Sequence, residues 1–234
     1  MAIKVIICLV LGYIFGCFQT GYFYGKLFKG IDVRNYGSGN AGTTNTLRTL
    51  GKPAGYIVFL GDALKAVFAV WIVRYLLFPG LGDVTKILET VTALGVVIGH
   101  NYPFYMHFKG GKGIAATGGF MFALDVRIAL IAAIVFAVVF FTTRYVSVGS
   151  LTITALFPIL MLIFYPGQWV VFGLSLIFTA LAWWRRPAWW ICTSISGTRV
   201  SPTRRTCTPA AGRLPGGGHQ PAGHAQHQTR HGFP

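Results

Sequence analysis

Acidic residues are scarce in this chain: five Asp and Glu stand among 234 residues, and only 11% of the sequence is charged. A soluble domain carries about 25% charged residues. The sequence is therefore not that of an ordinary soluble protein. So few carboxylates also exclude a mechanism that needs two of them as acid and base.

Metal and disulfide motifs are missing as well. The four cysteines form no CxxC pair, and no HExxH sequence occurs. These spacings favour neither a disulfide framework nor a zinc site. No Ser-His-Asp arrangement can be argued from spacing either. We therefore expect no metal ion and no cofactor, and a chemistry that relies on cations and hydrogen-bond donors.

Apolar residues, in contrast, are abundant: 54% of the chain is hydrophobic and the mean hydropathy is +0.61. A helix needs about 20 apolar residues to cross a bilayer. The apolar segments predict an all-α, polytopic membrane protein with about seven transmembrane helices. They cover residues 3–24, 53–78, 87–99, 114–124, 127–143, 146–165 and 168–184. The segment at 114–124 is short for a full crossing, so we expect a tilted or partly buried helix there.

The net charge of +15 is divided between two parts of the chain. Residues 1–184 contain 13 Lys and Arg against five acids, whereas residues 185–234 contain seven Arg and no acid. Basic residues collect in the cytoplasmic loops of membrane proteins, so this excess does not indicate nucleic-acid binding. Their distribution among the loops predicts that the N-terminus is outside and the C-terminus is cytoplasmic.

The composition changes abruptly near residue 185. Arg, Pro, Thr, Gly and His replace the aliphatic residues, and such a segment cannot bury a core. We therefore predict a membrane-embedded domain at 1–184 and a basic, disordered tail at 185–234. The histidines of the tail are expected to be incidental rather than metal ligands.

A glycine-rich loop follows the first apolar segment. Residues 37–45 read GSGNAGTTN, and Arg48 follows three residues later. Three glycines in six residues bend the backbone so that N–H groups can approach an anion. Arg48 can grip a phosphate with two donors. The alternative is a turn-rich loop without a ligand, since the sequence is not a Walker A motif.

A second glycine-rich loop runs from residue 100 to residue 113 and ends in KGGKG. It leads into an apolar helix, so an anion there would meet free N–H groups, the positive end of a helix dipole and two lysines. His100 could exchange a proton or orient a neighbour, whereas His107 is expected to be structural. The positive-inside rule places both loops on the cytoplasmic face, where they would form one composite site.

Two smaller polar features accompany the loops. Asp62 and Lys65 lie three residues apart on one helical face of the second segment. An unpaired charge at mid-bilayer costs about 2.5–3.5 kcal/mol. We expect the two to pair with each other in a structural role; the alternative is that one of them faces the site. Ser147 and Ser150 flank the entry to a later span, although Ser in a membrane helix commonly bonds its own backbone.

Taken in order, these motifs resemble the bacterial acyl-phosphate:glycerol-3-phosphate acyltransferases. The resemblance rests on GSGNAGTTN at 37–45 with Arg48, on HNYP at 100–103 and on FKGGKG at 108–113, and it covers about residues 5–184. It implies a seven-helix enzyme of the bacterial inner membrane with a cytoplasmic active site. It implies acyl transfer from acyl phosphate to the 1-hydroxyl of glycerol-3-phosphate, giving lysophosphatidic acid and phosphate for phospholipid synthesis. These two substrates and membrane lipids would be its partners.

The resemblance also implies which residues act. Ser38, His100 and Lys112 would be catalytic. The residues that would bind substrate or phosphate are Gly37, Gly39, Asn40, Thr43, Asn45, Arg48, Lys109, Gly110, Gly111, Gly113, Ser147 and Ser150. A covalent intermediate on Ser38 is disfavoured because no base is placed to activate the hydroxyl. We expect direct attack, with the phosphate of the donor as proton acceptor.

The end of the chain departs from that family. A segment resembling HRxNIxR is expected after the last helix, and RRPAWW stands here at 185–190. The hypothesis is a frameshift near Arg186 that makes the tail non-native. It predicts that an adjacent reading frame of the gene encodes the expected segment.

Two other functions share some of these features. A transporter of a phosphorylated solute would also have basic loops and apolar spans, but it should line several spans with polar residues. A membrane anchor that binds anionic lipid would need basic loops, but neither two glycine-rich loops nor His100.

Overall fold

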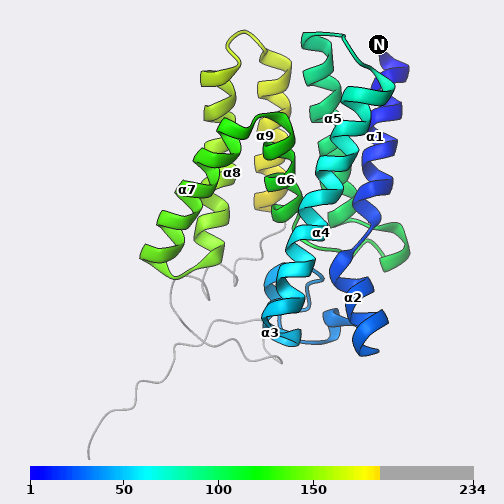
Figure 1. Cartoon of the computed structure of the whole chain (residues 1–234), viewed down its shortest axis with the longest axis vertical. Coiled ribbons are helices and arrows are strands. Elements are labelled where there is room, and N and C mark those ends of the chain that lie inside the picture. The colour runs from blue at the N-terminus through cyan, green and yellow to red at the C-terminus, as the bar shows by residue number, and fades with distance from the viewer. Residues whose placement is uncertain (185–234) are drawn as a thin grey trace, which may run out of the picture.

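The computed structural model describes residues 1–184, in which the regular elements are helices and no strand occurs, and this confirms the all-α prediction for that range (Figure 1). The tail at 185–234, and with it the frameshift hypothesis, lies outside the described residues. The α-helices are α1 (Ala2–Cys17), α2 (Thr20–Lys29), α3 (Thr43–Leu50), α4 (Lys52–Trp71), α5 (Asp83–Asn101), α6 (Ile114–Leu124), α7 (Val126–Thr143), α8 (Val146–Phe164) and α9 (Trp169–Trp184). Shorter elements are the 3-10 turns η1 (Val33–Asn35) and η3 (Phe104–Met106) and the π-helical η2 (Ile72–Leu77), which continues α4.

Four helical segments in the described range are long and apolar enough to cross a membrane. They are Ala2–Lys29, Lys52–Leu77, Val126–Thr143 and Val146–Phe164. α6 and α9 are apolar but shorter, as the sequence predicts for 114–124. α5 has 19 residues, but Asp83, Lys86 and Glu89 lie in its first two turns. Because α5, α6 and α9 are too short or too charged to be counted among the helices that can cross a membrane, the number of seven spans stays a prediction.

The first expected span, 3–24, is not one continuous helix. α1 and α2 are separated by Phe18 and Gln19, whose backbone is extended. The break leaves main-chain carbonyls without helical partners. The ammonium group of Lys65 on α4 binds two of them, at Phe18 (2.7 Å) and Gly16 (3.3 Å). A buried lysine thus takes the place of the missing helical hydrogen bonds.

α1 and α5 are in direct backbone contact along a seam of glycines. Gly12 and Gly16 on α1 face α5, and Gly95 and Gly99 on α5 face α1. A Cβ at Gly12 would lie 2.0 Å from the carbonyl oxygen of Thr92. Small residues at this four-residue spacing let membrane helices approach closely enough for packing contacts to hold them together. The seam fixes the end of α5, and the loop that follows it, against α1.

α6 lies in the middle of the bundle, between α4 on one side and α7 to α9 on the other (Figure 1). Its Phe120 stacks on Phe178 of α9, with ring centroids 5.3 Å apart, and meets Phe157 of α8 edge to face. Its Gly119 packs against α4, where a Cβ would lie 2.1 Å from the carbonyl oxygen of Ala63. The helix that begins after the second glycine-rich loop is therefore held from several directions.

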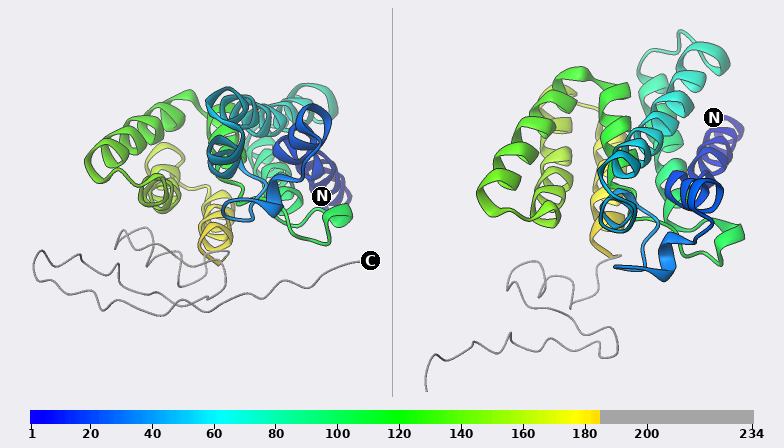
Figure 2. Two further views of the ribbon diagram at one scale, coloured as in Figure 1. Left: turned by 90° about the horizontal axis from the view of Figure 1, so that it is seen from below. Right: turned by 60° about the horizontal axis from the view of Figure 1, so that its bottom comes forward.

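The two ends of the bundle differ in charge. In Figures 1 and 2 the N-terminus and the turns before α5, α7 and α9 lie at one end, whereas α2, α3 and the α7–α8 turn lie at the other. The segment between α5 and α6 also lies toward this second end, which we call the basic end. Among residues 1–184, the charged residues of this end are Lys26, Lys29, Asp32, Arg34, Arg48, Lys52, Lys109, Lys112 and Arg144. Eight cations against one carboxylate make this end attractive to anions.

Candidate active site

Loop 1, which comprises residues 33–42, is organised by Asn45, whose side chain is buried at the start of α3. The amide nitrogen of Asn45 donates to the carbonyl oxygens of Val33 (2.8 Å), Asn40 (2.8 Å) and Tyr36 (3.1 Å). Its amide oxygen accepts from the backbone N–H (2.7 Å) and the hydroxyl (3.2 Å) of Ser38. The polar atoms of Asn45 are thus used within the loop, where they hold Ser38 in an exposed position.

Glycine is required at the tip of loop 1. Gly37 and Gly39 have φ angles of +60° and +71°, and a Cβ at Gly37 would lie 2.3 Å from the amide oxygen of Asn45. α3 starts directly after the loop, and no side chain caps its N-terminus. Its first N–H groups have no helical acceptors and suit an anion. The hydroxyl of Thr43 beside them is buried and has no hydrogen-bond partner among the described residues.

Loop 2, which comprises residues 102–113, folds back onto the end of α5. The N–H of Gly110 donates to the carbonyl oxygen of Asn101 (3.1 Å), and that of Gly111 donates to the carbonyl oxygen of His100 (2.9 Å). The close approach needs glycine, because a Cβ at Gly111 would lie 1.9 Å from Nε2 of His100. Gly113, with φ of +75°, then opens α6, whose N-terminus also lacks a side-chain cap.

The predicted cations lie in loop 2, before the start of α6, and in the last turn of α3. Lys109 is exposed and Lys112 is half-buried in loop 2, and Arg48 is exposed on α3. The two lysines before α6 combine point charges with the oriented N–H donors of an uncapped helix N-terminus. The arrangement is suited to binding phosphate groups.

Arg34 joins the two loops. Its guanidinium donates to the carbonyl oxygens of Met106 (3.3 Å) and Lys109 (3.4 Å) in loop 2, and it lies over the ring of Tyr22. Asp32 holds it through a bidentate contact whose shortest distance is 2.7 Å. These hydrogen bonds lower the pKa of the Asp32 carboxyl and raise that of the Arg34 guanidinium. The expected proximity of the two glycine-rich loops is therefore confirmed.

A buried polar cluster lies behind loop 2. The predicted pairing of Asp62 with Lys65 is confirmed, with Nζ 2.9 Å from Oδ1. The same ammonium nitrogen lies 2.8 Å from Nδ1 of His100, and Thr20 donates its hydroxyl to Asp62 (3.1 Å). The pair that was expected to be structural is thus in contact with a predicted catalytic residue, a link that sequence spacing did not reveal.

Three further hydrogen bonds fix loop 2 and the end of α5 to the α1–α2 break. The side chain of Gln19 donates to the carbonyl oxygen of His100 (2.8 Å), and the hydroxyl of Tyr105 donates to that of Cys17 (2.6 Å). The hydroxyl of Tyr13 donates to the carbonyl oxygen of Tyr102 (3.0 Å). A tyrosine hydroxyl is protonated at neutral pH even at its ordinary pKa of about 10, and burial raises the pKa of Tyr105 further, to about 12. None of these residues stood out in the sequence, because each lies among apolar neighbours.

Ser147 and Ser150 lie in the first turns of α8, at the basic end (Figure 1). The hydroxyl of Ser150 donates to the carbonyl oxygen of Ser147 (3.0 Å) and is buried. This is the local back-bonding expected of Ser in a membrane helix. Both residues thus lie at the basic end, with Ser150 bound to its own helix.

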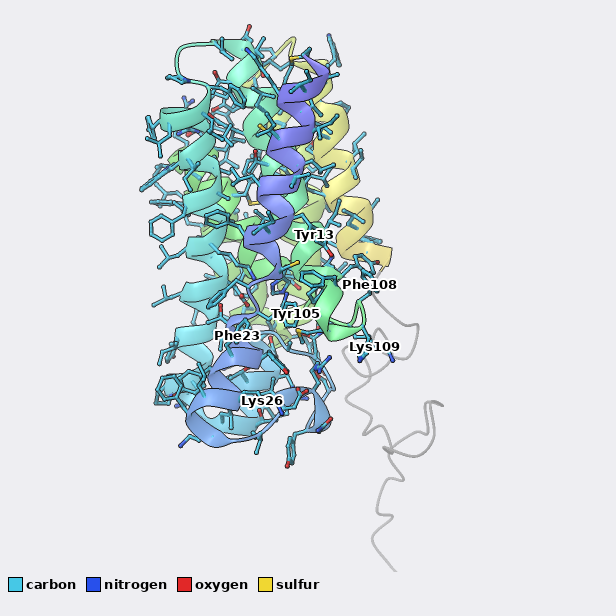
Figure 3. All side chains as sticks on the ribbon, turned by 90° about the vertical axis from the view of Figure 1, so that its right-hand side faces the viewer. Tyr13, Phe23, Lys26, Tyr105, Phe108 and Lys109 are labelled. Atoms are coloured by element: carbon cyan, nitrogen blue, oxygen red, sulfur yellow. The ribbon has the colours of Figure 1, made fainter. Side chains whose placement is uncertain are left out.

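An apolar groove of about 280 Å³ opens beside loop 2. Its lining comes from the end of α1, from α2 and from η3: Tyr13, Ile14, Cys17, Phe18, Phe23, Phe104 and Tyr105. In Figure 3, Tyr13, Tyr105 and Phe23 follow one another down this face, with Lys26 and Lys109 beyond them toward the basic end. An apolar groove that ends near cations suits an amphiphile with an anionic head. Within residues 1–184, no group of three or more His, Cys, Asp or Glu residues is placed to hold a metal ion.

Comparison with known proteins gives one consistent result. A family model described as "Glycerol-3-phosphate acyltransferase" matches residues 6–190. A relative of that description from Thermoanaerobacter sp. (strain X514) is 40% identical over 173 residues, which are 74% of this chain and 83% of the relative. Another from Clostridioides difficile (strain 630) is 43% identical over 157 residues, 67% of this chain and 76% of the relative.

Two crystal structures of PlsY (YgiH), an integral membrane glycerol 3-phosphate acyltransferase, are similar in fold. The glycerol 3-phosphate form is 35% identical, with a TM-score of 0.70 over 77% of this chain and 87% of that chain. The lysophosphatidic acid form is 34% identical, with a TM-score of 0.70 over 82% and 92%. By its sequence match and by its fold, this chain belongs to the glycerol-3-phosphate acyltransferase family.

Proposed function

We propose that this chain transfers a fatty acyl group to the 1-hydroxyl of glycerol-3-phosphate, with acyl phosphate as the donor, and releases lysophosphatidic acid and inorganic phosphate. Family membership supports the acceptor and the product, since the related crystal structures contain glycerol 3-phosphate and lysophosphatidic acid. The donor is proposed from the chemistry of the site. Both substrates then carry a phosphate, and the basic end offers two places to bind one.

The observation that carries the proposal is the contact of Arg34 with loop 2, which brings two glycine-rich loops together. Each loop ends at an uncapped helix N-terminus. Two anion-binding positions within one surface fit a reaction between two phosphorylated molecules better than binding of a single solute. We propose that loop 1 with Arg48 and loop 2 with Lys109 and Lys112 each take one phosphate.

The apolar groove lined by Tyr13, Phe23 and Tyr105 supports a lipid-like donor. An acyl chain in this groove would leave its phosphate near Lys109 and loop 2, at the surface of the membrane. Neither a water-soluble carrier protein nor a nucleotide is needed to explain this arrangement. Membrane lipids would cover the remaining apolar surface of the bundle.

The proposed step is direct. The 1-hydroxyl oxygen of glycerol-3-phosphate forms a bond to the acyl carbonyl carbon, and the bond from that carbon to the phosphate oxygen breaks. The hydroxyl proton passes to the departing phosphate, so atoms and charge balance without a separate base. The role of the protein is to hold both reactants and to stabilise the oxyanion. Ser38 would position the acceptor, and Lys112 would neutralise phosphate charge.

We propose seven crossings, formed by α1, α4, α5, α6, α7, α8 and α9, with the N-terminus outside. The basic end then faces the cytoplasm, in agreement with the positive-inside rule. The membrane would be the bacterial inner membrane. Glycerol-3-phosphate would reach the loops from the cytoplasm, and the donor would enter from the lipid side.

The test is an assay of the purified full chain in vesicles with labelled glycerol-3-phosphate. Acyl phosphate, acyl-CoA and acylated carrier protein are offered in separate arms. The proposal predicts lysophosphatidic acid and one phosphate released per ester only with acyl phosphate. Lys112→Ala should abolish turnover, while Lys29→Ala, an exposed cation at the same end, should not. Uptake of glycerol-3-phosphate into sealed vesicles without ester formation would instead indicate a transporter.

A mass-spectrometric trap tests the direct step. Rapid quenching during turnover should yield no acylated Ser38. An acylated Ser38 that forms and decays at the rate of turnover would replace direct attack by a covalent intermediate.

A parallel assay of a chain whose residues 185–234 follow the adjacent reading frame shows whether the tail affects turnover.

A further inference from the structure

Lys65 is surrounded by groups that accept hydrogen bonds. Its Nζ lies 2.7 Å from the carbonyl oxygen of Phe18, 2.9 Å from Oδ1 of Asp62 and 3.3 Å from the carbonyl oxygen of Gly16. The fourth neighbour is Nδ1 of His100, at 2.8 Å. The side chains of Lys65 and Asp62 are both almost fully buried. In this setting the two charges have to stay paired and hydrogen-bonded, because an unpartnered buried charge is costly.

Counting donors and acceptors decides the state of the histidine. An ammonium group has three hydrogens and no acceptor, so it serves three of these four neighbours. They are the carbonyl oxygen of Phe18, Oδ1 of Asp62 and Nδ1 of His100, because the carbonyl oxygen of Gly16, at 3.3 Å, also accepts from the side chain of Gln19 (3.3 Å). A neutral amine would leave Asp62 buried without its counter-charge. Lys65 is therefore the donor in its contact with His100. A ring nitrogen that accepts carries no proton, so the proton of the neutral imidazole is on Nε2.

The opposite side of the ring faces loop 2. A Cβ at Gly111 would lie 1.9 Å from Nε2 of His100, so that nitrogen is directed at the glycine-rich segment. The main chain around the ring is fixed as well, because Gln19 and the N–H of Gly111 both donate to the carbonyl oxygen of His100. Lys65 binds one edge of the imidazole, and loop 2 covers the other.

We propose that Lys65 and Asp62 are positioning residues for the acyl transfer: they hold His100 as the neutral Nε2–H tautomer, so that it serves loop 2 as a hydrogen-bond donor and not as a general base. Asp62 neutralises Lys65, and Thr20 in turn orients Asp62. The α1–α2 break contributes by supplying carbonyls to the same ammonium. The role in catalysis rests on the proposed acyltransferase activity, whereas the tautomer can be measured without it.

The experiment reads the ring nitrogens by NMR. The full chain is prepared with ¹⁵N-labelled histidine in lipid nanodiscs, and the signals of His100 are identified by their loss in His100→Gln. The chain has six histidines in all, so this subtraction is sufficient. We expect Nδ1 to be unprotonated and Nε2 to be protonated at the pH of the assay. A proton on Nδ1, or on both nitrogens, would overturn the proposal.

Variants test the cause. Because Lys65→Met alone leaves Asp62 buried and unpaired, the variant used is Asp62→Asn combined with Lys65→Met, which removes both charges. It should lose the single-tautomer pattern and lower kcat by about 10²-fold, the size typical for a lost oxyanion donor. The KM for glycerol-3-phosphate should change little. Lys65→Arg keeps a charged donor and should retain the Nδ1-unprotonated pattern.

A matched control separates positioning from general destabilisation. Glu89→Gln removes a buried carboxylate of α5 that pairs with Arg74 of η2 at 2.6 Å, and it lies about 16 Å along α5 from His100. It should leave the histidine signals unchanged. A double variant of Asp62 and Lys65 with an unchanged His100 spectrum and unchanged kcat would refute the positioning role. A wild-type chain that makes no lysophosphatidic acid would refute the activity and leave the tautomer to be decided by its own spectrum.

Discussion

Replacing Asn45 by alanine should open loop 1 and leave the helical bundle intact. The amide nitrogen of Asn45 has two hydrogens shared among three carbonyls, and its oxygen accepts two hydrogen bonds from Ser38. About four net hydrogen bonds at about 0.5–1.5 kcal/mol each amount to about 2–6 kcal/mol. Water can replace part of this loss because Tyr36 and Ser38 are exposed. A loss of about 2–4 kcal/mol therefore remains.

A loss of that size shifts the loop equilibrium toward open forms by about 30-fold to 700-fold. Hydrogen exchange followed by mass spectrometry should show faster exchange across residues 33–42 and unchanged exchange in α5. The kcat/KM for glycerol-3-phosphate should fall by at least about tenfold, because the acceptor is no longer held. Insertion into the membrane should be unaffected.

A second variant of Asn45 and a control variant in loop 1 sharpen the result. Asn45→Asp keeps the size but replaces the donors by a carboxylate facing three carbonyl oxygens, so it should be at least as damaging as alanine. Asn35→Ala changes an exposed asparagine of the same loop and should be silent. Normal turnover in Asn45→Ala, with loop 1 exchanging faster, would remove loop 1 from the site. Unchanged exchange would mean that these hydrogen bonds do not hold the loop.

Three other outcomes follow from the packing and the charges. Gly119→Ala should lower Tm by about 2–10 °C, because its Cβ would meet α4 at 2.1 Å, whereas Gly118→Ala, with open space around it, should not lower Tm. Hydrogen bonds from Arg127 lower the pKa of Asp125 to about 2, below its ordinary 3.8. Asp125 therefore contributes its full stabilisation above about pH 4, and this contribution is lost as the pH falls through 2. The wild type should have a higher Tm than Asp125→Asn above about pH 4, and this difference should disappear as the pH is lowered from 4 through 2. Arg34→Gln should lower kcat/KM about tenfold with little change in Tm, and an unaltered kcat/KM would show that its bonds to loop 2 are dispensable.

Much of the architecture was predictable because membrane helices are specified by composition. The apolar segments located the long helices, and the shortness of 114–124 was confirmed by α6, which has 11 residues. The pairing of Asp62 with Lys65 followed from their spacing on one helical face. The co-location of the two loops followed from the positions of Lys and Arg alone.

What could not be predicted depends on contacts between distant parts of the chain. Nothing in the apolar sequence around Phe18 and Gln19 indicates a break, since the partner that stabilises it is Lys65, 47 residues away in the sequence. The contact between Lys65 and His100 is likewise tertiary. α3 was hidden inside a segment expected to be a loop, because its eight residues are mostly polar.

Some residues of the candidate site could be identified from the sequence, whereas the role of others depends on tertiary contacts. Glycines and exposed cations were identifiable from sequence because their chemistry is local. In the sequence, Arg34 cannot be distinguished from the solvated cations of a basic loop. The structure shows that it joins loop 1 to loop 2. Asn45 was identified as a residue of the site, and its hydrogen bonds indicate that it orders the loop from within.

The most direct test concerns the shared position of the two loops. Single cysteines are placed at Tyr36 of loop 1 and His107 of loop 2, both exposed, in a chain whose natural cysteines are replaced by serine. A membrane-impermeant maleimide is applied to sealed vesicles of known orientation, with and without glycerol-3-phosphate. We expect both cysteines to react from the cytoplasmic side only, and glycerol-3-phosphate to slow both reactions. Labelling from opposite sides of the membrane, or no effect of glycerol-3-phosphate on either loop, would contradict a shared site.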